Sequence, residues 1–141
     1  MFNLTFKGRL SILFIEKRKG IDFMRKIITY VAWDGEKFDT EEECRRYEES
    51  DIDAMRELIA SYEFDTGITQ LSVMIYEDDI EKTIDEFDDA YGKCTYVNIK
   101  KIPSKKSLDF MDDVFGMSLL PKEVGRYWYD FNMSKWEKVA D

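Results

Sequence analysis

The chain has 141 residues, 44% of them hydrophobic, which suits one domain with a core of its own. Its formal net charge of −9 disfavours direct binding to nucleic acid or to anionic membranes, and favours basic proteins, cations or apolar surfaces as partners. The sequence contains no histidine, which excludes Ser-His-Asp and Cys-His catalysis and histidine metal sites.

The first 23 residues differ in composition from the rest. They carry five basic residues against two acidic ones, although the whole chain is acidic. The codons of Arg18-Lys19-Gly20 can form a purine-rich ribosome-binding sequence shortly before Met24. We therefore expect residues 1–23 to be an N-terminal extension ahead of the true start at Met24, and residues 24–141 to be a single α+β domain. The alternative is a genuine N-terminal strand at residues 2–6 or 10–15.

Residues 25–33 (RKIITYVAW) are rich in β-branched and aromatic side chains, which predicts a strand that ends at the Asp34-Gly35 turn. Residues 36–38 can return as a short strand. Thr40 to Glu43 have the spacing of a capping box, so a helix is expected to begin there. Ser50-Asp51 is a candidate break in that helix.

The two cysteines, Cys44 and Cys94, lie far apart and lack CxxC spacing. Unpaired cysteines of this kind are typical of the reducing cytoplasm, so we expect a cytoplasmic protein of the bacterial host. Cys44 falls on the apolar stripe of the predicted helix and is interpreted as a buried thiol. Residues 10–15 are apolar but too short to cross a membrane.

Residues 71–76 (LSVMIY) are predicted to form a largely buried strand. Asp78-Asp79 then begins a second helix, which Gly92 is expected to end. Residues 95–102 alternate in polarity and predict a further strand. The second helix has one apolar face, formed by Ile80, Ile84, Phe87 and Tyr91.

Ser107 is expected to begin a short helix that ends before Gly116, with Leu108, Met111 and Phe115 toward the core. Residues 126–131 and 135–139 then flank a turn, the pattern of a terminal β-hairpin. The order predicts an α+β fold: a small mixed or antiparallel sheet, two to four helices mainly on one face, and a C-terminal β-hairpin.

Two short segments carry a resemblance. The run from Tyr30 to Cys44, followed by Tyr47-Glu48, contains Asp-Gly-x-x-Phe and Glu-x-x-x-Tyr-Glu. It resembles the opening of small uncharacterised proteins of Gram-positive phages and mobile elements, and residues 125–136 are similar to the aromatic hairpin that closes several of them. The resemblance implies a phage or prophage origin and accessory work such as host takeover or anti-defence. It carries over no catalytic residue.

The second helix is unusually acidic, with eight acids between Glu77 and Asp89 against Lys82 alone. Its apolar face should anchor it in the core, which leaves the acids outside. Such a face can occupy a nucleic-acid channel on a basic partner and compete with phosphates, or it can serve only to solubilise the protein. The candidate partner-binding residues are Asp78, Asp79, Glu81, Asp85, Glu86, Asp88 and Asp89.

The aromatic hairpin is the second candidate surface. Alternation places Tyr127, Tyr129 and Phe131 on one face and Trp128 on the other. Exposed aromatic rings are common binding hot spots, so Trp128, Tyr129 and Trp136 are the candidate residues. The alternative is that these rings pack under a neighbouring helix.

A magnesium site is the remaining chemistry to weigh, from Glu77, Asp79 and Glu81-Lys82 or from Asp112-Asp113. Adjacent acids on a helix diverge, so we expect no catalytic residue, no metal site and no cofactor. The favoured hypothesis is a phage or mobile-element accessory protein that binds a basic host protein stoichiometrically, such as an anti-CRISPR-like inhibitor of a nucleic-acid-handling defence complex. The alternatives are a small carboxylate- and Mg²⁺-dependent enzyme acting on nucleic acid, and a homo-oligomeric assembly component, for example a homodimer.

Overall fold

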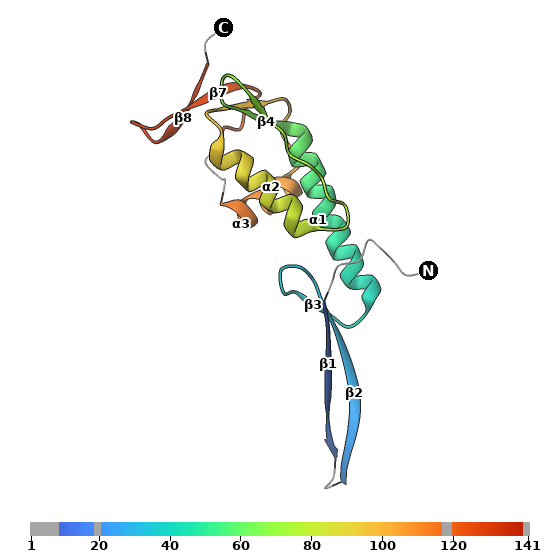
Figure 1. Cartoon of the computed structure of the whole chain (residues 1–141). Helices are drawn as coiled ribbons and strands as arrows, with labels where there is room; N and C mark the ends of the chain where they lie inside the picture. Colours follow the sequence, from blue (N-terminus) through green and yellow to red (C-terminus); the bar gives the residue numbers. More distant parts are fainter. Residues whose placement is uncertain (1–8, 19–20, 117–119, 140–141) are drawn as a thin grey trace.

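A computed structural model describes residues 9–18, 21–116 and 120–139 of the chain (Figure 1). Within them, helices and antiparallel strands alternate in an α+β fold, as the sequence predicts. The strands are β1 (Arg9–Arg18), β2 (Ile21–Val31), β3 (Lys37–Phe38), β4 (Tyr62–Asp65), β5 (Gln70–Leu71), β6 (Tyr96–Ile99), β7 (Gly125–Asp130) and β8 (Lys135–Lys138). The helices are α1 (Glu41–Ser61), α2 (Ile80–Lys93) and α3 (Lys105–Phe115).

The main sheet of the described chain has five antiparallel strands in the order β5-β4-β6-β7-β8. Alternation divides its central strands into a buried face and an open face. Phe64 and Val97 are almost fully buried, and they belong to a core cluster that also contains Phe87 of α2 and Met111 of α3. The helices therefore cover one face of this sheet, and the opposite face carries polar side chains and Trp128.

Helix α1 begins where the capping box predicts. The Thr40 hydroxyl accepts a hydrogen bond from the Glu43 amide at 3.1 Å and donates one to the Glu43 carboxylate at 2.9 Å. The predicted break at Ser50-Asp51 is wrong, because α1 continues unbroken to Ser61. The Asp51 carboxylate accepts a hydrogen bond from the Trp33 indole at 2.8 Å, so this side chain is engaged with the preceding turn and does not compete for the helix backbone.

Two other boundaries differ from the prediction. Helix α2 passes through Gly92 and ends at Lys93, and the cap of α3 is Ser104 rather than Ser107. Ser104 accepts a hydrogen bond from the Ser107 amide at 3.3 Å, which places Ser107 inside the first turn of the helix. Gly116 adopts φ 64°, the left-handed conformation that ends a helix, as predicted.

The predicted strand at residues 71–76 is mostly wrong, since only Gln70–Leu71 pair, with β4. The segment that follows is tied to α2 by a side chain instead. The Thr83 hydroxyl accepts a hydrogen bond from the Tyr76 amide at 2.8 Å and lies 3.1 Å from the Tyr76 carbonyl oxygen. These bonds satisfy backbone groups that a neighbouring strand would otherwise pair.

The second sheet has the order β1-β2-β3; β3 lies near the start of α1, and β1 and β2 extend away from the helices in Figure 1. Residues 10–15 lie in β1, which pairs with β2, and the other proposed strand at residues 2–6 lies outside the described residues. The predicted domain boundary falls inside β2, which contains Met24. The boundary itself stays a prediction. Among the described residues, no helix has the length and apolar character needed to cross a membrane.

Candidate functional site

Helix α2 presents its acids as expected, with its apolar side against the core. Ile80 and Phe87 are buried, and Ile84 and Tyr91 are partly buried against the same cluster. On the outer side Asp78, Glu81, Asp85, Asp88 and Asp89 are exposed, and Asp79 and Glu86 are partly exposed.

Asp79 and Asp89 of this acidic face make contacts that stabilise α2. Asp79 is the N-cap of α2 and accepts a hydrogen bond from the Lys82 amide at 3.1 Å. Asp89 forms an exposed ion pair with Lys93 at 2.9 Å, one turn along the helix. Exposed pairs of this kind contribute less than about 1 kcal/mol, so Asp89 remains available to a partner.

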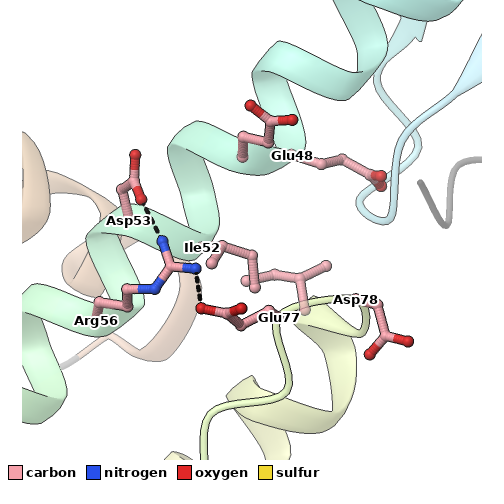
Figure 2. A pocket seen from close by; sticks show the side chains of 8 residues that line it. Glu48, Ile52, Asp53, Arg56, Glu77 and Asp78 are labelled. Carbon is pink, nitrogen blue, oxygen red and sulfur yellow. Dashed lines mark hydrogen bonds and ion pairs between the residues drawn. The ribbon is translucent and has the colours of Figure 1, made fainter. Parts of the chain in front are cut away.

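The acidic face continues into a hollow between α1 and the beginning of α2, with a volume of about 240 Å³ (Figure 2). Asp78 belongs to both. Helix α1 adds carboxylates that the sequence analysis did not include in a site, because they lie about 30 residues earlier in the chain. The acidic side chains that line the hollow are Glu48, Glu49, Asp53, Glu77 and Asp78.

Arg56 is the one basic side chain in the described lining of this hollow, and it is held by acids from both sides. One guanidinium nitrogen lies 2.5 Å from Asp53, and another bonds the Glu77 carboxylate (Figure 2). These two acids, with the hydrogen bond to Glu77 first, raise the pKa of Arg56 further. The guanidinium thus links α1 to the segment before α2 and neutralises only part of the local negative charge.

The aromatic hairpin β7–β8 adjoins the other end of α2. Tyr129 and Trp136 lie directly opposite each other, with ring centroids 5.2 Å apart, and Trp136 also lies 6.4 Å from Tyr91 of α2. Tyr129 and Trp136 are therefore partly packed, which is the alternative that the sequence left open. Phe131 lies at the tip of the hairpin, 76% exposed, with its ring 4.9 Å from Tyr129.

Trp128 points to the opposite face of the sheet, as alternation predicts, and is 38% exposed. It lies beside Tyr96 across the β6–β7 pair. The three hairpin candidates are thus divided between the two faces of the sheet. They therefore do not form one patch. Helix α2, about 21 Å long, runs from the hollow at its beginning to Tyr129 and Trp136 near its end.

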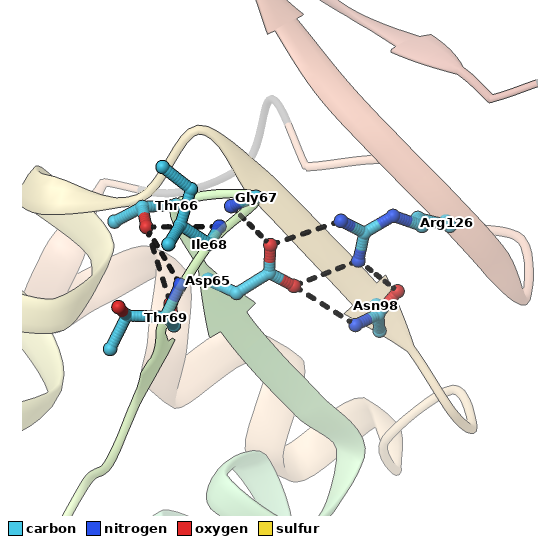
Figure 3. Close-up of polar contacts among 7 residues, drawn as sticks. All are labelled: Asp65, Thr66, Gly67, Ile68, Thr69, Asn98 and Arg126. Atoms are coloured by element: carbon cyan, nitrogen blue, oxygen red, sulfur yellow. Dashed lines mark hydrogen bonds and ion pairs between the residues drawn. The ribbon is translucent and has the colours of Figure 1, made fainter.

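The open face of the sheet holds a polar cluster centred on Asp65 (Figure 3). Arg126 donates to both carboxylate oxygens of Asp65, at 2.8 and 3.0 Å, and its guanidinium lies 4.2 Å from the Tyr96 ring centroid. Asn98 completes the cluster between them. The Arg126 hydrogen bonds hold the pKa of Asp65 below its usual range. Such a bidentate pair joins β4, β6 and β7, which is a structural role.

The carboxylates weighed for magnesium have other contacts. Glu77 bonds Arg56 and Asp79 caps α2, while Asp112 and Asp113 are exposed on α3. In the described parts of the chain, no three cysteine or acidic side chains are grouped closely enough to hold a metal ion.

The residues of the Asp-Gly-x-x-Phe and Glu-x-x-x-Tyr-Glu motifs bind one another and hold the turn against α1. Tyr47 donates its hydroxyl hydrogen to Asp34 of the turn, and its ring lies 5.1 Å from Phe38. The Glu48 carboxylate accepts a hydrogen bond from the Trp33 amide at 2.8 Å. These contacts fix the turn on α1, so spacing that looked like a family signature also has a structural reason. Cys44 is fully buried beneath it, as predicted, and burial raises the pKa of its thiol to about 11.

Comparison with protein-family models, with curated proteins and with solved structures finds no match to this chain. The functional argument therefore rests on the residues themselves.

Proposed function

We propose that this chain is a protein-binding module whose acidic surface docks on a basic surface of another protein. The surface consists of the acidic face of α2 and the hollow between α1 and α2. The observation that supports this proposal most is the hollow, where acidic side chains of α1 lie next to the beginning of the acidic face of α2. A concave acidic site gives a basic side chain contacts from two helices, and complementary charge speeds the encounter.

The acidic composition and the resemblance of the opening motif support one class of partner. A phage or mobile-element protein that covers a basic nucleic-acid channel blocks it stoichiometrically, because its carboxylates take the place of phosphates. A nucleic-acid-handling defence complex of the bacterial host is such a target. This activity needs no catalytic residue in the chain.

Chemical-shift mapping tests the site. A ¹⁵N-labelled chain is titrated with an oligolysine peptide at low salt, and the expected shifts concentrate on α2 and on the adjoining turns of α1. Glu49→Gln with Asp78→Asn should weaken binding, since it removes two charges from the rim of the hollow. Shifts spread evenly over the acidic surface, with no preference for the hollow, would contradict the proposal.

The hairpin favours a second candidate function, self-association. Phe131 and Met133 are 76% and 62% exposed at its tip, and Trp128 is exposed on the open face. The turn that presents them is ordered, because the Asp130 carboxylate accepts hydrogen bonds from the amides of Asn132 and Met133. Sedimentation equilibrium over a concentration series separates the functions: Phe131→Ser should abolish any dimer without affecting oligolysine binding.

A further inference from the structure

A second hollow lies at the opening motif, between the Asp34-Gly35 turn, α1 and α3. Its volume is about 370 Å³, within the range of small-molecule sites. It is separate from the acidic surface proposed above. Aromatic and acidic side chains line it together: the rings of Trp33, Tyr47 and Phe110, and the carboxylates of Asp34, Asp51 and Asp113.

The rings are fixed in place. Trp33 and Phe110 meet edge to face, with centroids 6.4 Å apart and planes at 61°. Tyr47 is held by its hydroxyl on Asp34 and by the Phe38 ring. A cation that enters the hollow can be attracted by the electron-rich faces of these rings, and rings already held in place need little further ordering.

Asp51 is the most enclosed of the three carboxylates. The Trp33 indole donates to one of its oxygens at 2.8 Å, and no other hydrogen bond reaches it from the residues that the structure describes. Burial, with a smaller contribution from the charge of Asp34, raises the pKa of Asp51 to about 6. The indole hydrogen bond and Lys106 of α3 act in the opposite direction. A ligand that brings positive charge would replace the solvation that Asp51 has lost.

We propose that this hollow binds an organic cation, an alkylammonium or guanidinium group, against the rings of Trp33 and Phe110 and the carboxylate of Asp51. A small metal ion fits poorly, because among the described residues these carboxylates do not converge closely enough to coordinate one. A larger cation spreads its charge over several ångströms and also packs against the rings. The described lining holds no basic side chain, and Lys106 of α3, outside it, acts on Asp51 through its charge without a hydrogen bond.

Binding of the cation should depend on pH through the ionisation of Asp51. The charged groups around Asp51 are Asp34 on the turn and Lys106 and Asp113 on α3. A cation binds the ionised carboxylate. Its affinity should therefore increase by about tenfold from pH 5 to pH 7 and then level off, as Asp51 loses its proton.

The Trp33 indole N–H signal reports on the site directly, since it bonds Asp51, and a Trp33→Phe spectrum assigns it. The probes are n-butylguanidinium and n-butylammonium, with the uncharged isostere n-butylurea at equal ionic strength. Both cations should give a saturable shift and n-butylurea none. Capped Gly-Arg-Gly and Gly-Lys-Gly peptides then distinguish a protein side chain from a free amine: tighter binding of the peptides indicates the side chain.

Variants decide the roles. Asp51→Asn should weaken the cation at least tenfold at pH 7 and remove the pH dependence, and Phe110→Leu should weaken it at every pH while the pH dependence remains. Asp109→Asn is the matched control, because Asp109 is on α3 beside Phe110 but outside the lining. It should change neither the affinity for the cation nor its pH dependence. Equal shifts with n-butylurea, no saturable shift with either cation, or unchanged affinity in Asp51→Asn would overturn the proposal.

Discussion

Asp65 and Arg126 lie 61 residues apart in the chain and meet on the open face of the sheet. No local spacing indicates such a pair, so sequence reasoning did not find it. The same holds for Asp51, whose partner Trp33 precedes it by 18 residues across a turn. Local pairings were found: the Thr40 cap and the buried Cys44 follow from spacing and periodicity alone.

The Asp65–Arg126 pair should matter for stability. Arg126→Ala leaves a largely buried carboxylate without its main partner and is expected to lower the free energy of unfolding by about 2 kcal/mol. Lys105→Ala, which removes a fully exposed ion pair with Asp109, is the control and should lower stability far less. Urea unfolding of both variants provides the measurement, and equal small losses would contradict the assigned role.

The pH dependence of this pair has a definite sign. The folded-state pKa of Asp65 is lowered, so its contribution is present above the unfolded value near 3.8 and is lost as the pH falls through the folded value. The stability difference between the wild type and Asp65→Asn should thus be constant from pH 8 to about pH 5 and shrink below pH 4. A difference that disappears already at pH 6 would be inconsistent with the lowered pKa.

At the scale of elements, capping and periodicity predicted most helices and the terminal hairpin. They failed where tertiary contacts decide. Residues 71–76 have the composition of a strand, but most of them find no neighbouring strand, and the Thr83 hydroxyl holds the backbone of Tyr76 at their end. Helix α1 tolerates Ser50-Asp51 because Asp51 is drawn to the Trp33 indole. The acidic face of α2 was predictable, and the contribution of α1 to the hollow was not, because it requires knowing which helices are neighbours.

Helix α2 should separate stability from binding. Asp85→Asn, Glu86→Gln and Asp89→Asn together should leave stability unchanged or slightly higher, by a few tenths of a kcal/mol, because like charges repel along the helix. Phe87→Ala removes a fully buried ring and should cost about 3 to 4 kcal/mol. Thermal unfolding of the two proteins compares them. A large loss in the acidic variant would show that these acids serve the fold.

At the scale of the whole molecule, the α+β class follows from the order of elements, which left open whether the sheet is mixed or antiparallel. The separate three-stranded sheet β1-β2-β3 was not expected, because the sequence of its strands does not show whether they pair with each other or with the main sheet. Among the described side chains, every buried member of the core cluster lies in α1 or later in the chain. Trp33, which precedes α1, packs against this cluster.

Removal of residues 1–23 tests the predicted domain boundary. Strand β1 pairs only with β2 in the described sheet, at its edge, so the shortened chain should keep cooperative unfolding and the Tm of the full chain. Differential scanning calorimetry of both forms gives the comparison. Broad or non-cooperative unfolding of the shortened chain would place these residues in the domain.

The central claim is that a particular acidic surface, and not net charge alone, binds a basic partner. The measurement is the affinity for an oligolysine peptide over a salt series, for the wild type, for the Asp85→Asn, Glu86→Gln and Asp89→Asn variant, and for a variant with the same loss of charge elsewhere. That control carries Glu36→Gln, Asp39→Asn and Glu123→Gln. The account predicts weaker binding and a flatter salt dependence for the α2 variant, with the control close to the wild type. Equal losses in both variants would contradict it.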